Sequence, residues 1–436
     1  MKAVCFLVAL QFVSAAALAV PFTGKVVGPD GKPVGGVTVR ATAQPAASKL
    51  TSGGVATVSG PDGAFSLDVT VPAGGRIYIG LGRKGFFNLA GLIDPAKGLD
   101  IGEVELNPLT MIDNEHYTWV KPYFPKADAS DLGCNFCHGA QYDAWKKSRM
   151  AGSAKNPRVL SLYNGTALDG HAVGGGFRDL HPGEAGPCAN CHAAAAAINA
   201  PGETVLSEVT GTATEGVFCD ICHKARAVDI GAGPGVGGAL KLQRPSAWDG
   251  LFAFGPFVDA SPMPMATSYN PLISESRLCA GCHEWTNDQG VPVLSTYSEW
   301  AEMSGADPDA LRCQDCHMKK KFGADYQGEA KGLAYILDDS HMQGMYGVLR
   351  EKSTIHPHVF HGAAEYIQDA ASVELELSQE GGELVARVQI DNVNAGHALP
   401  TGMPFRHLIL YVEALVDGKP VAQTGGTKVP DYGGEG

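Results

Sequence analysis

Cys134-Asn-Phe-Cys137-His138 is the first of five copies of one pentapeptide, Cys-x-x-Cys-His, that this chain of 436 residues carries. The other copies are Cys188-Ala-Asn-Cys191-His192, Cys219-Asp-Ile-Cys222-His223, Cys279-Ala-Gly-Cys282-His283 and Cys313-Gln-Asp-Cys316-His317. Two thiols three positions apart can lie on one turn of a helix, with the imidazole of the next residue beside them. Because the spacing is the same in every copy, it decides how the middle of the chain is built.

This pattern is the attachment site of a c-type haem. The two thiols can reach the two vinyl groups of one porphyrin, and the His then binds the iron as its proximal ligand. Zinc is the competing interpretation, but zinc does not require a His directly after the second Cys, and all five pairs have one. A thioredoxin-like redox pair would occur once. The sequence therefore predicts five covalent haem c groups and electron transfer.

The chain has 11 cysteines, and the five motifs use ten of them. The remaining one, Cys5, lies in a predicted signal peptide, residues 1–19. That segment has a positive Lys2, an apolar run too short to span a bilayer, and small residues before a cleavage point at Ala19. We expect no disulfide and no integral membrane segment. The mature protein is expected to be secreted across the cytoplasmic membrane, into the periplasm or to the cell surface.

The formal net charge is −13, and haem propionates would make the surface more acidic still. This balance argues against nucleic acid and anionic membranes as partners. It favours transient contact with basic patches on redox partner proteins, an electron donor and an electron acceptor.

Three regions follow the predicted signal peptide, and we expect a multi-domain fold. Residues 20–107 contain short alternating segments separated by turns such as Gly28-Pro-Asp-Gly31, which predict a β-sandwich. Residues 108–365 hold every motif. With roughly 50 residues per haem, too few for five independent apolar cores, the porphyrins should form the core within short helices and irregular loops.

In residues 366–436 apolar and polar residues alternate again, which predicts a C-terminal β-domain. We expect this domain to contribute a distal haem ligand. Strands are expected over 373–377, 384–390 and 408–416, with a hairpin turn at Asp417-Gly418. A sandwich normally needs more strands than these. We expect either that the natural chain continues or that another element or chain completes the domain.

The ligand on the second face of each iron decides between an electron carrier and an enzyme. Nine of the 14 His lie outside the motifs, so all five irons could have two His ligands. The candidate distal ligands are His171, His181, His341, His358, His361 and His397, with Met150 and Met265 as alternatives. His358 and His361 would share one face if that stretch were helical. A Met in this position would raise the haem potential, although Met is more often core filler.

Two resemblances extend this interpretation. The N-terminal pattern, with Pro33-Val-Gly-Gly-Val-Thr-Val, looks like a carboxypeptidase regulatory-like domain, which implies a non-catalytic docking or spacer module. The segments Tyr142-Asp-Ala-Trp145 and Glu215-Gly-Val-Phe-Cys219 look like the multihaem cytochrome c superfamily of respiratory bacteria. This resemblance implies an electron carrier or a reductase. Many relatives have His where Met150 stands, often as a distal ligand.

Three functions therefore compete. The first is an exported pentahaem electron carrier of an anaerobic-type respiratory chain, which is not an enzyme. The second is an oxidoreductase that reduces a small nitrogen or sulfur compound at an open haem. The third is a structural subunit, a homo-oligomer or conductive surface assembly built through the terminal β-domains. All five motifs end in His, whereas some reductases of the superfamily use Lys at the substrate haem.

Overall fold

The computed structural model describes residues 19–44, 54–72, 74–123, 133–260, 265–305, 307, 310–318, 333–334, 350–351, 354–362, 368–404 and 406–428. The predicted signal peptide, apart from Ala19, and the candidate ligand His341 lie outside the described residues. Ala19 is the first residue of strand β1.

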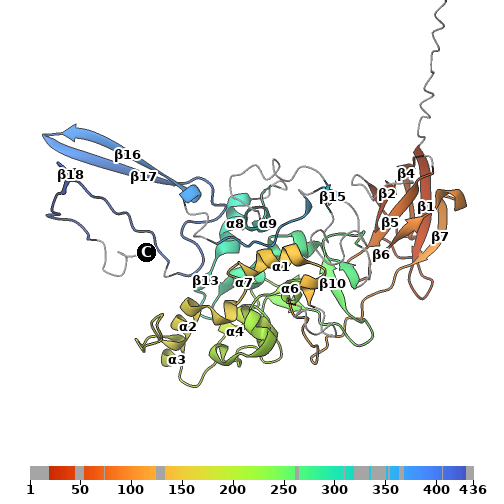
Figure 1. The fold of residues 1–436 in the computed structure, drawn as a ribbon, viewed down its shortest axis with the longest axis horizontal. Coiled ribbons are helices and arrows are strands. Elements are labelled where there is room, and N and C mark those ends of the chain that lie inside the picture. The colour runs from red at the N-terminus through yellow and green to blue at the C-terminus, as the bar shows by residue number, and fades with distance from the viewer. Residues whose placement is uncertain are drawn as a thin grey trace, which may run out of the picture.

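The N-terminal region is a β-sandwich, as predicted (Figure 1). One sheet has the order β4-β1-β7, formed by β1 (Ala19–Val27), β4 (Ala64–Thr70) and β7 (Asp100–Glu105). The other has the order β3-β2-β5-β6, formed by β2 (Thr38–Gln44), β3 (Val55–Val58), β5 (Arg76–Gly82) and β6 (Leu89–Ile93). A short 3-10 helix, η1 (Pro95–Lys97), precedes β7. Buried and exposed residues alternate along β4, so one face of the strand points into the sandwich and the other toward solvent. Phe22, Val39 and Leu67 belong to the core between the two sheets.

The sandwich is docked on the middle region. Asn88 is 5% exposed; its amide donates to the Phe257 carbonyl at 2.9 Å and its carbonyl accepts from the Tyr269 N–H at 2.9 Å. Strand β5 approaches so closely that a Cβ on Gly80 would lie 2.3 Å from the Cα of Asp259. A spacer connected only by a linker would not have such contacts, so the sandwich forms part of the scaffold around the motifs.

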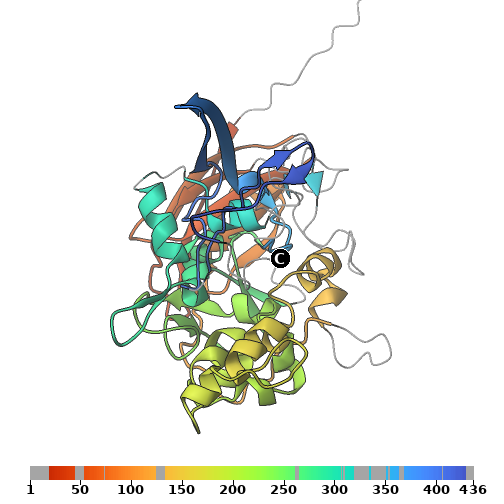
Figure 2. The same cartoon turned by 90° about the vertical axis from the view of Figure 1, so that its left-hand side faces the viewer.

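Short helices and long loops make up the middle region, which confirms the expected irregular architecture (Figure 2). The helices are α1 (Gly139–Lys146), α2 (Pro157–Asn164), α3 (Phe177–Leu180), α4 (Cys188–His192), α5 (Ala194–Ala197), α6 (Cys219–Cys222), α7 (Arg277–His283), α8 (Thr296–Ser304) and α9 (Cys313–His317). The 3-10 helices are η2 (Cys134–Phe136), η3 (Ser153–Lys155), η4 (Leu206–Glu208), η5 (Gly211–Glu215) and η6 (Pro271–Ser274). The two-stranded sheets are β8 (Ala225–Val228) with β9 (Leu240–Leu242), β10 (Phe252–Gly255) with β11 (Ala266–Tyr269), β12 (Trp285–Thr286) with β13 (Pro292–Leu294), and β14 (Leu333–Ala334) with β15 (Arg350–Glu351).

The sequence sets these helix lengths locally. The α2 helix begins with the Asn156 side chain accepting from the Arg158 N–H and with Pro157 in its first turn. It ends at Gly165, which takes a left-handed conformation.

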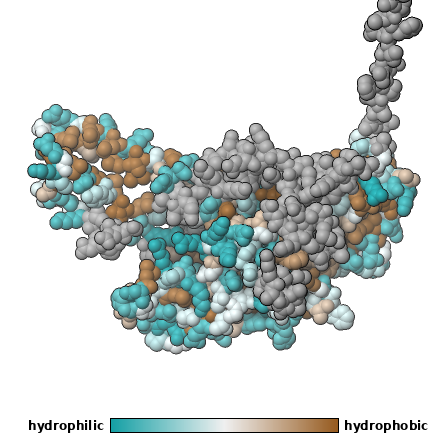
Figure 3. Space-filling model, in the orientation of Figure 1, coloured by the Kyte–Doolittle hydropathy of each residue, from teal (hydrophilic) through white to brown (hydrophobic). Residues whose placement is uncertain are grey.

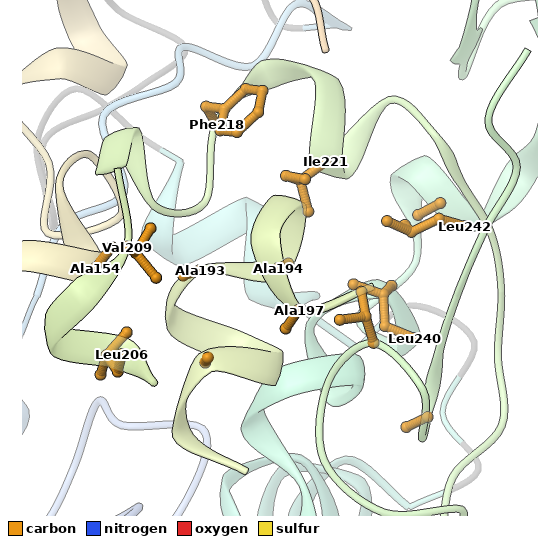
Figure 4. Packing of buried hydrophobic residues seen from close by; sticks show 14 of the residues in the cluster. Ala154, Ala193, Ala194, Ala197, Leu206, Val209, Phe218, Ile221, Leu240 and Leu242 are labelled. Atoms are coloured by element: carbon orange, nitrogen blue, oxygen red, sulfur yellow. The ribbon is translucent and has the colours of Figure 1, made fainter. Parts of the chain in front are cut away.

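Alanine is the most frequent residue in the core of the middle region. Ala193, Ala194 and Ala197 are fully buried around Leu206 and Ile221 (Figure 4). Alanines allow short segments to approach closely, so neighbouring motifs can lie near one another while each remains on its own short helix.

The C-terminal region is an extended hairpin, β16 (Ala371–Glu380) paired with β17 (Glu383–Asn392) through Gly381-Gly382, and it projects from the middle region (Figure 1). The strands predicted over 373–377 and 384–390 are confirmed. The strand predicted over 408–416 is wrong apart from Leu415–Val416, which forms β18 with β19 (Lys419–Pro420) around the predicted Asp417-Gly418 turn. Apolar residues of the hairpin and of the following segment remain exposed, because no described neighbour covers them (Figure 3).

None of the helices in the described residues combines the length and apolarity needed to cross a membrane.

Candidate haem-binding sites

Four of the five Cys-x-x-Cys-His motifs form short α-helices. These are α4, α6, α7 and α9; the first motif starts on a single 3-10 turn, η2. The ten motif cysteines are free and partly buried, with no disulfide among them. In four motifs both cysteines thus lie within one short α-helix, and in the first motif Cys137 directly follows the 3-10 turn that holds Cys134.

A backbone carbonyl orients the imidazole of two motif histidines. The Nδ1 of His223 lies 2.7 Å from the Phe254 carbonyl, and the Phe254 N–H donates back to the His223 carbonyl at 2.8 Å. His317 makes the same exchange with His361, at 2.9 and 3.0 Å. A carbonyl at Nδ1 fixes the tautomer in which Nε2 carries the lone pair, the arrangement typical of metal-bound histidines.

Two histidines from distant segments face these imidazoles. The ring centroids of His223 and His358 are 6.3 Å apart with planes inclined by 20°, and those of His317 and His397 are 6.2 Å apart with planes inclined by 12°. The partner rings also hold Nδ1 against a carbonyl, that of His356 at 3.1 Å for His358 and that of Ala398 at 2.9 Å for His397.

The separation is too large for ring-on-ring contact and fits one metal ion between the rings. A metal–imidazole bond is about 2 Å long. The ring nitrogen lies roughly 1.1 Å from the ring centre, given ring bonds of about 1.33 Å. Two imidazoles on opposite sides of one ion therefore have centroids about 6 Å apart by these bond lengths. The residues present thus fit a haem iron with two histidine ligands at the third and fifth motifs.

The imidazoles of His138, His283 and His358 are kept neutral, as metal ligands must be. Burial lowers the pKa of His138 and of His283 to about 4, and neighbouring histidines add to the effect. Burial, with His223 nearby, lowers the pKa of His358 to about 3.

The His397 loop is fixed to the middle region by α8. The Ala398 N–H donates to the Glu299 carboxylate at 3.2 Å, and the hydroxyl of Thr401 contacts both Glu299 and Thr296. The C-terminal region thereby places the His397 imidazole near that of His317, and its contribution of a distal haem ligand stays a prediction.

The remaining candidate ligands are placed differently. His171 is exposed with Nδ1 2.5 Å from Asp169, and His181 is exposed and stacked on Phe177. Met150 packs against the central core, and Met265 is half-buried. His361 contacts the fifth motif through its backbone. Among the described residues, no ring contact joins His138, His192 or His283 to a second imidazole.

The segment His356–Gly362 is extended rather than helical, so His358 and His361 do not act from one helix face. Pro357 disfavours a helical conformation at the residue before it, His356. Phe360 has a positive φ of 44°, which a right-handed helix does not allow. His358 consequently reaches the third motif while His361 lies at the fifth.

A buried ion pair beside the third motif was not foreseen from the sequence. Lys224, fully buried, donates to Asp220 at 2.6 Å and to the Phe252 carbonyl at 2.6 Å. Asp220 also accepts from the Tyr117 hydroxyl at 2.9 Å and the Val120 N–H at 3.0 Å. The only sequence signal was an Asp and a Lys four residues apart, a spacing usually found on exposed helix faces.

No cluster of three or more His, Cys, Asp or Glu side chains suited to a bare metal ion occurs within the described part of the chain. Tetrahedral zinc sites require four such donors around one point.

Comparisons with known proteins agree with the haem interpretation over part of the chain. Residues 133–224, which contain the first three motifs, match the family model of cytochrome c554 and c-prime. No curated protein matches the chain. Among solved structures, 3-chlorocatechol 1,2-dioxygenase from Rhodococcus opacus 1CP is 13% identical over 20% of this chain and 60% of that chain. Its TM-score of 0.17 is too low to support an argument about fold. The match supports a c-type cytochrome domain over residues 133–224; proteins of that class bind haem covalently, are typically exported, and transfer electrons with redox partner proteins.

Proposed function

We propose that the chain is an exported pentahaem cytochrome that carries electrons in a respiratory chain of the anaerobic type. Each Cys-x-x-Cys-His motif would attach one haem c, whose iron supplies the one-electron redox chemistry. The protein supplies ligands, spacing and electrostatics.

The observation that carries this proposal is the pair of facing imidazoles at the third and fifth motifs. An iron held between His223 and His358, or between His317 and His397, has both faces closed by protein. Such an iron has no coordination position for a substrate, so it is suited to accept and release electrons rather than to bind a small molecule.

The groups around the two histidine pairs also suit electron transfer. Each of the four imidazoles is held by a backbone carbonyl at Nδ1, which keeps the ring in place when the charge of the iron changes. The acidic net charge of −13 favours partners that present basic patches. Their contact with this protein should weaken as salt increases.

The test is to express the protein with the haem-attachment machinery and to record low-temperature EPR of the oxidised protein, followed by CO binding to the reduced form. We expect low-spin signals from the haems of the third and fifth motifs and no CO at either. His358→Ala and His397→Ala identify these two haems, because each variant should convert one low-spin haem to a high-spin, CO-binding one. A protein in which neither variant changes the spectra would overturn the proposed ligation.

The oxidoreductase alternative is decided in the same experiment. A wild-type haem that is high-spin and binds CO, together with reduction of nitrite, hydroxylamine or tetrathionate, would replace the carrier proposal with an enzyme.

A further inference from the structure

The five motifs touch one another in an order that differs from their order in the sequence. The first and third motifs are neighbours, because both contact the same short segment of the chain. One segment joins both motifs, because the Lys121 carbonyl accepts from the Cys134 N–H at 3.0 Å while the Val120 N–H donates to Asp220. The motif thiols stand where the thioether sulfurs of attached haems would lie.

The fifth motif adjoins the start of α7, the helix of the fourth motif. The Cys313 N–H donates to the Ser276 hydroxyl at 3.0 Å, and the Gln314 amide donates to the Glu275 carbonyl at 2.8 Å. Two independent hydrogen bonds thus fix α9 against the two residues that directly precede α7.

The second motif adjoins the other end of α7. A loop from elsewhere in the chain connects the two motifs, because the Gly235 N–H donates to the Gly281 carbonyl at 2.9 Å and the next N–H donates to the Asn190 carbonyl at 3.1 Å. Both acceptors are the residues between the cysteines of their motifs.

The third motif also adjoins α7. Arg277 in α7 donates from Nε to the Val228 carbonyl at 3.1 Å, in the strand that directly follows the third motif. Asn270, which caps the 3-10 helix before α7, donates to the Ala225 carbonyl of the same strand at 3.0 Å.

We propose that α7 is the junction of a branched arrangement, in which the fourth motif adjoins the second, third and fifth motifs while the first adjoins only the third among the motifs. The inference rests on the proposed function, because it requires a haem at every motif. A branched arrangement has three ends, at the first, second and fifth motifs, so it offers three places for exchange with redox partners.

An iron anomalous map from a crystal of the haem-loaded full chain tests the arrangement directly. We expect five iron positions, with the fourth-motif iron having three near neighbours and the first-motif iron having one. Five irons in an unbranched row would overturn the junction and leave the proposed function standing. Fewer than five irons would overturn the proposed function itself.

A matched pair of glycine variants tests the contact between the second and fourth motifs in solution. Gly235 has a φ of +62°, and a Cβ there would lie 2.3 Å from the Asn190 carbonyl oxygen and 2.8 Å from the Cys191 Sγ. Gly231 has a similar positive φ of +94°, but its Cβ would meet nothing within 4 Å. Both alanine variants share the backbone strain, and only Gly235→Ala separates the motifs.

The measurement is a potentiometric titration followed by EPR on the loaded proteins. We expect Gly235→Ala to shift the midpoint potentials of two haems, because their mutual electrostatic interaction changes with their separation. Gly231→Ala should leave all five potentials unchanged. Equal titrations for Gly235→Ala and Gly231→Ala would contradict the contact.

Discussion

Replacing Lys224 by Met removes a buried charge while keeping a side chain of similar length. The ammonium of Lys224 has no exposed surface, donates two hydrogen bonds of 2.6 Å, and lies 5.5 Å from the ring centroids of Tyr117 and Phe252. Its loss leaves the Asp220 carboxylate, which is 5% exposed, without its counter-charge.

The expected cost follows from what remains around that carboxylate. Breaking a buried ion pair by removing one partner costs about 3–5 kcal/mol. Asp220 keeps the hydrogen bonds from Tyr117 and Val120, so we expect a loss near the lower end, about 3 kcal/mol. For a domain of this size each kcal/mol lowers Tm by about 2–4 °C, which gives a decrease of about 6–12 °C.

The assay is thermal unfolding of the haem-loaded protein, followed by circular dichroism, for Lys224→Met, Asp220→Asn and the double variant. The double variant should recover most of the lost stability, because a neutral amide no longer needs the ammonium and can still accept from Tyr117 and Val120. A Tm for Lys224→Met within 2 °C of the wild-type value would refute the reasoning. Additive losses in the double variant would refute it as well.

Three further predictions concern the ligands, the domain contact and acid stability. His358→Ala should give one high-spin, CO-binding haem, and unchanged EPR would exclude His358 as a ligand. Gly80→Ala should expose the boundary between the sandwich and the middle region to limited proteolysis, whereas Gly91→Ala, with nothing within 4 Å of its Cβ, should not. Although burial opposes it, hydrogen bonding to Arg244 lowers the pKa of Asp113 below 3.8, so ionised Asp113 stabilises the fold above about pH 4. Above that pH, Asp113→Asn should lower the free energy of unfolding by about 1–2 kcal/mol. In urea titrations the difference between variant and wild type should shrink as pH falls through the lowered pKa of Asp113.

The local chemistry of each motif could be predicted from the sequence, because covalent attachment requires two thiols and an imidazole at a fixed spacing. The sandwich could be predicted for the same kind of reason, since alternation along Phe65–Val69 specifies one buried and one exposed face. Of the strand expected over 408–416 only Leu415–Val416 formed, because a strand needs a partner strand and no described strand pairs with the rest of that segment.

The pairing of distant side chains could not be predicted in this way. Nothing local to His358 indicates that it faces His223, 135 positions earlier, or that His397 faces His317. The buried Lys224 was missed because its spacing from Asp220 is also the spacing of an ordinary exposed helical pair.

The central claim is that all five motifs bind haem covalently. Intact-mass spectrometry of the protein produced with haem-attachment machinery, combined with a pyridine haemochrome assay, measures this number directly. The account predicts a mass equal to the exported chain plus five haems, and a haemochrome spectrum typical of two thioether bonds per haem. A mature chain that carries fewer than five haems when attachment is complete in a control cytochrome would contradict it.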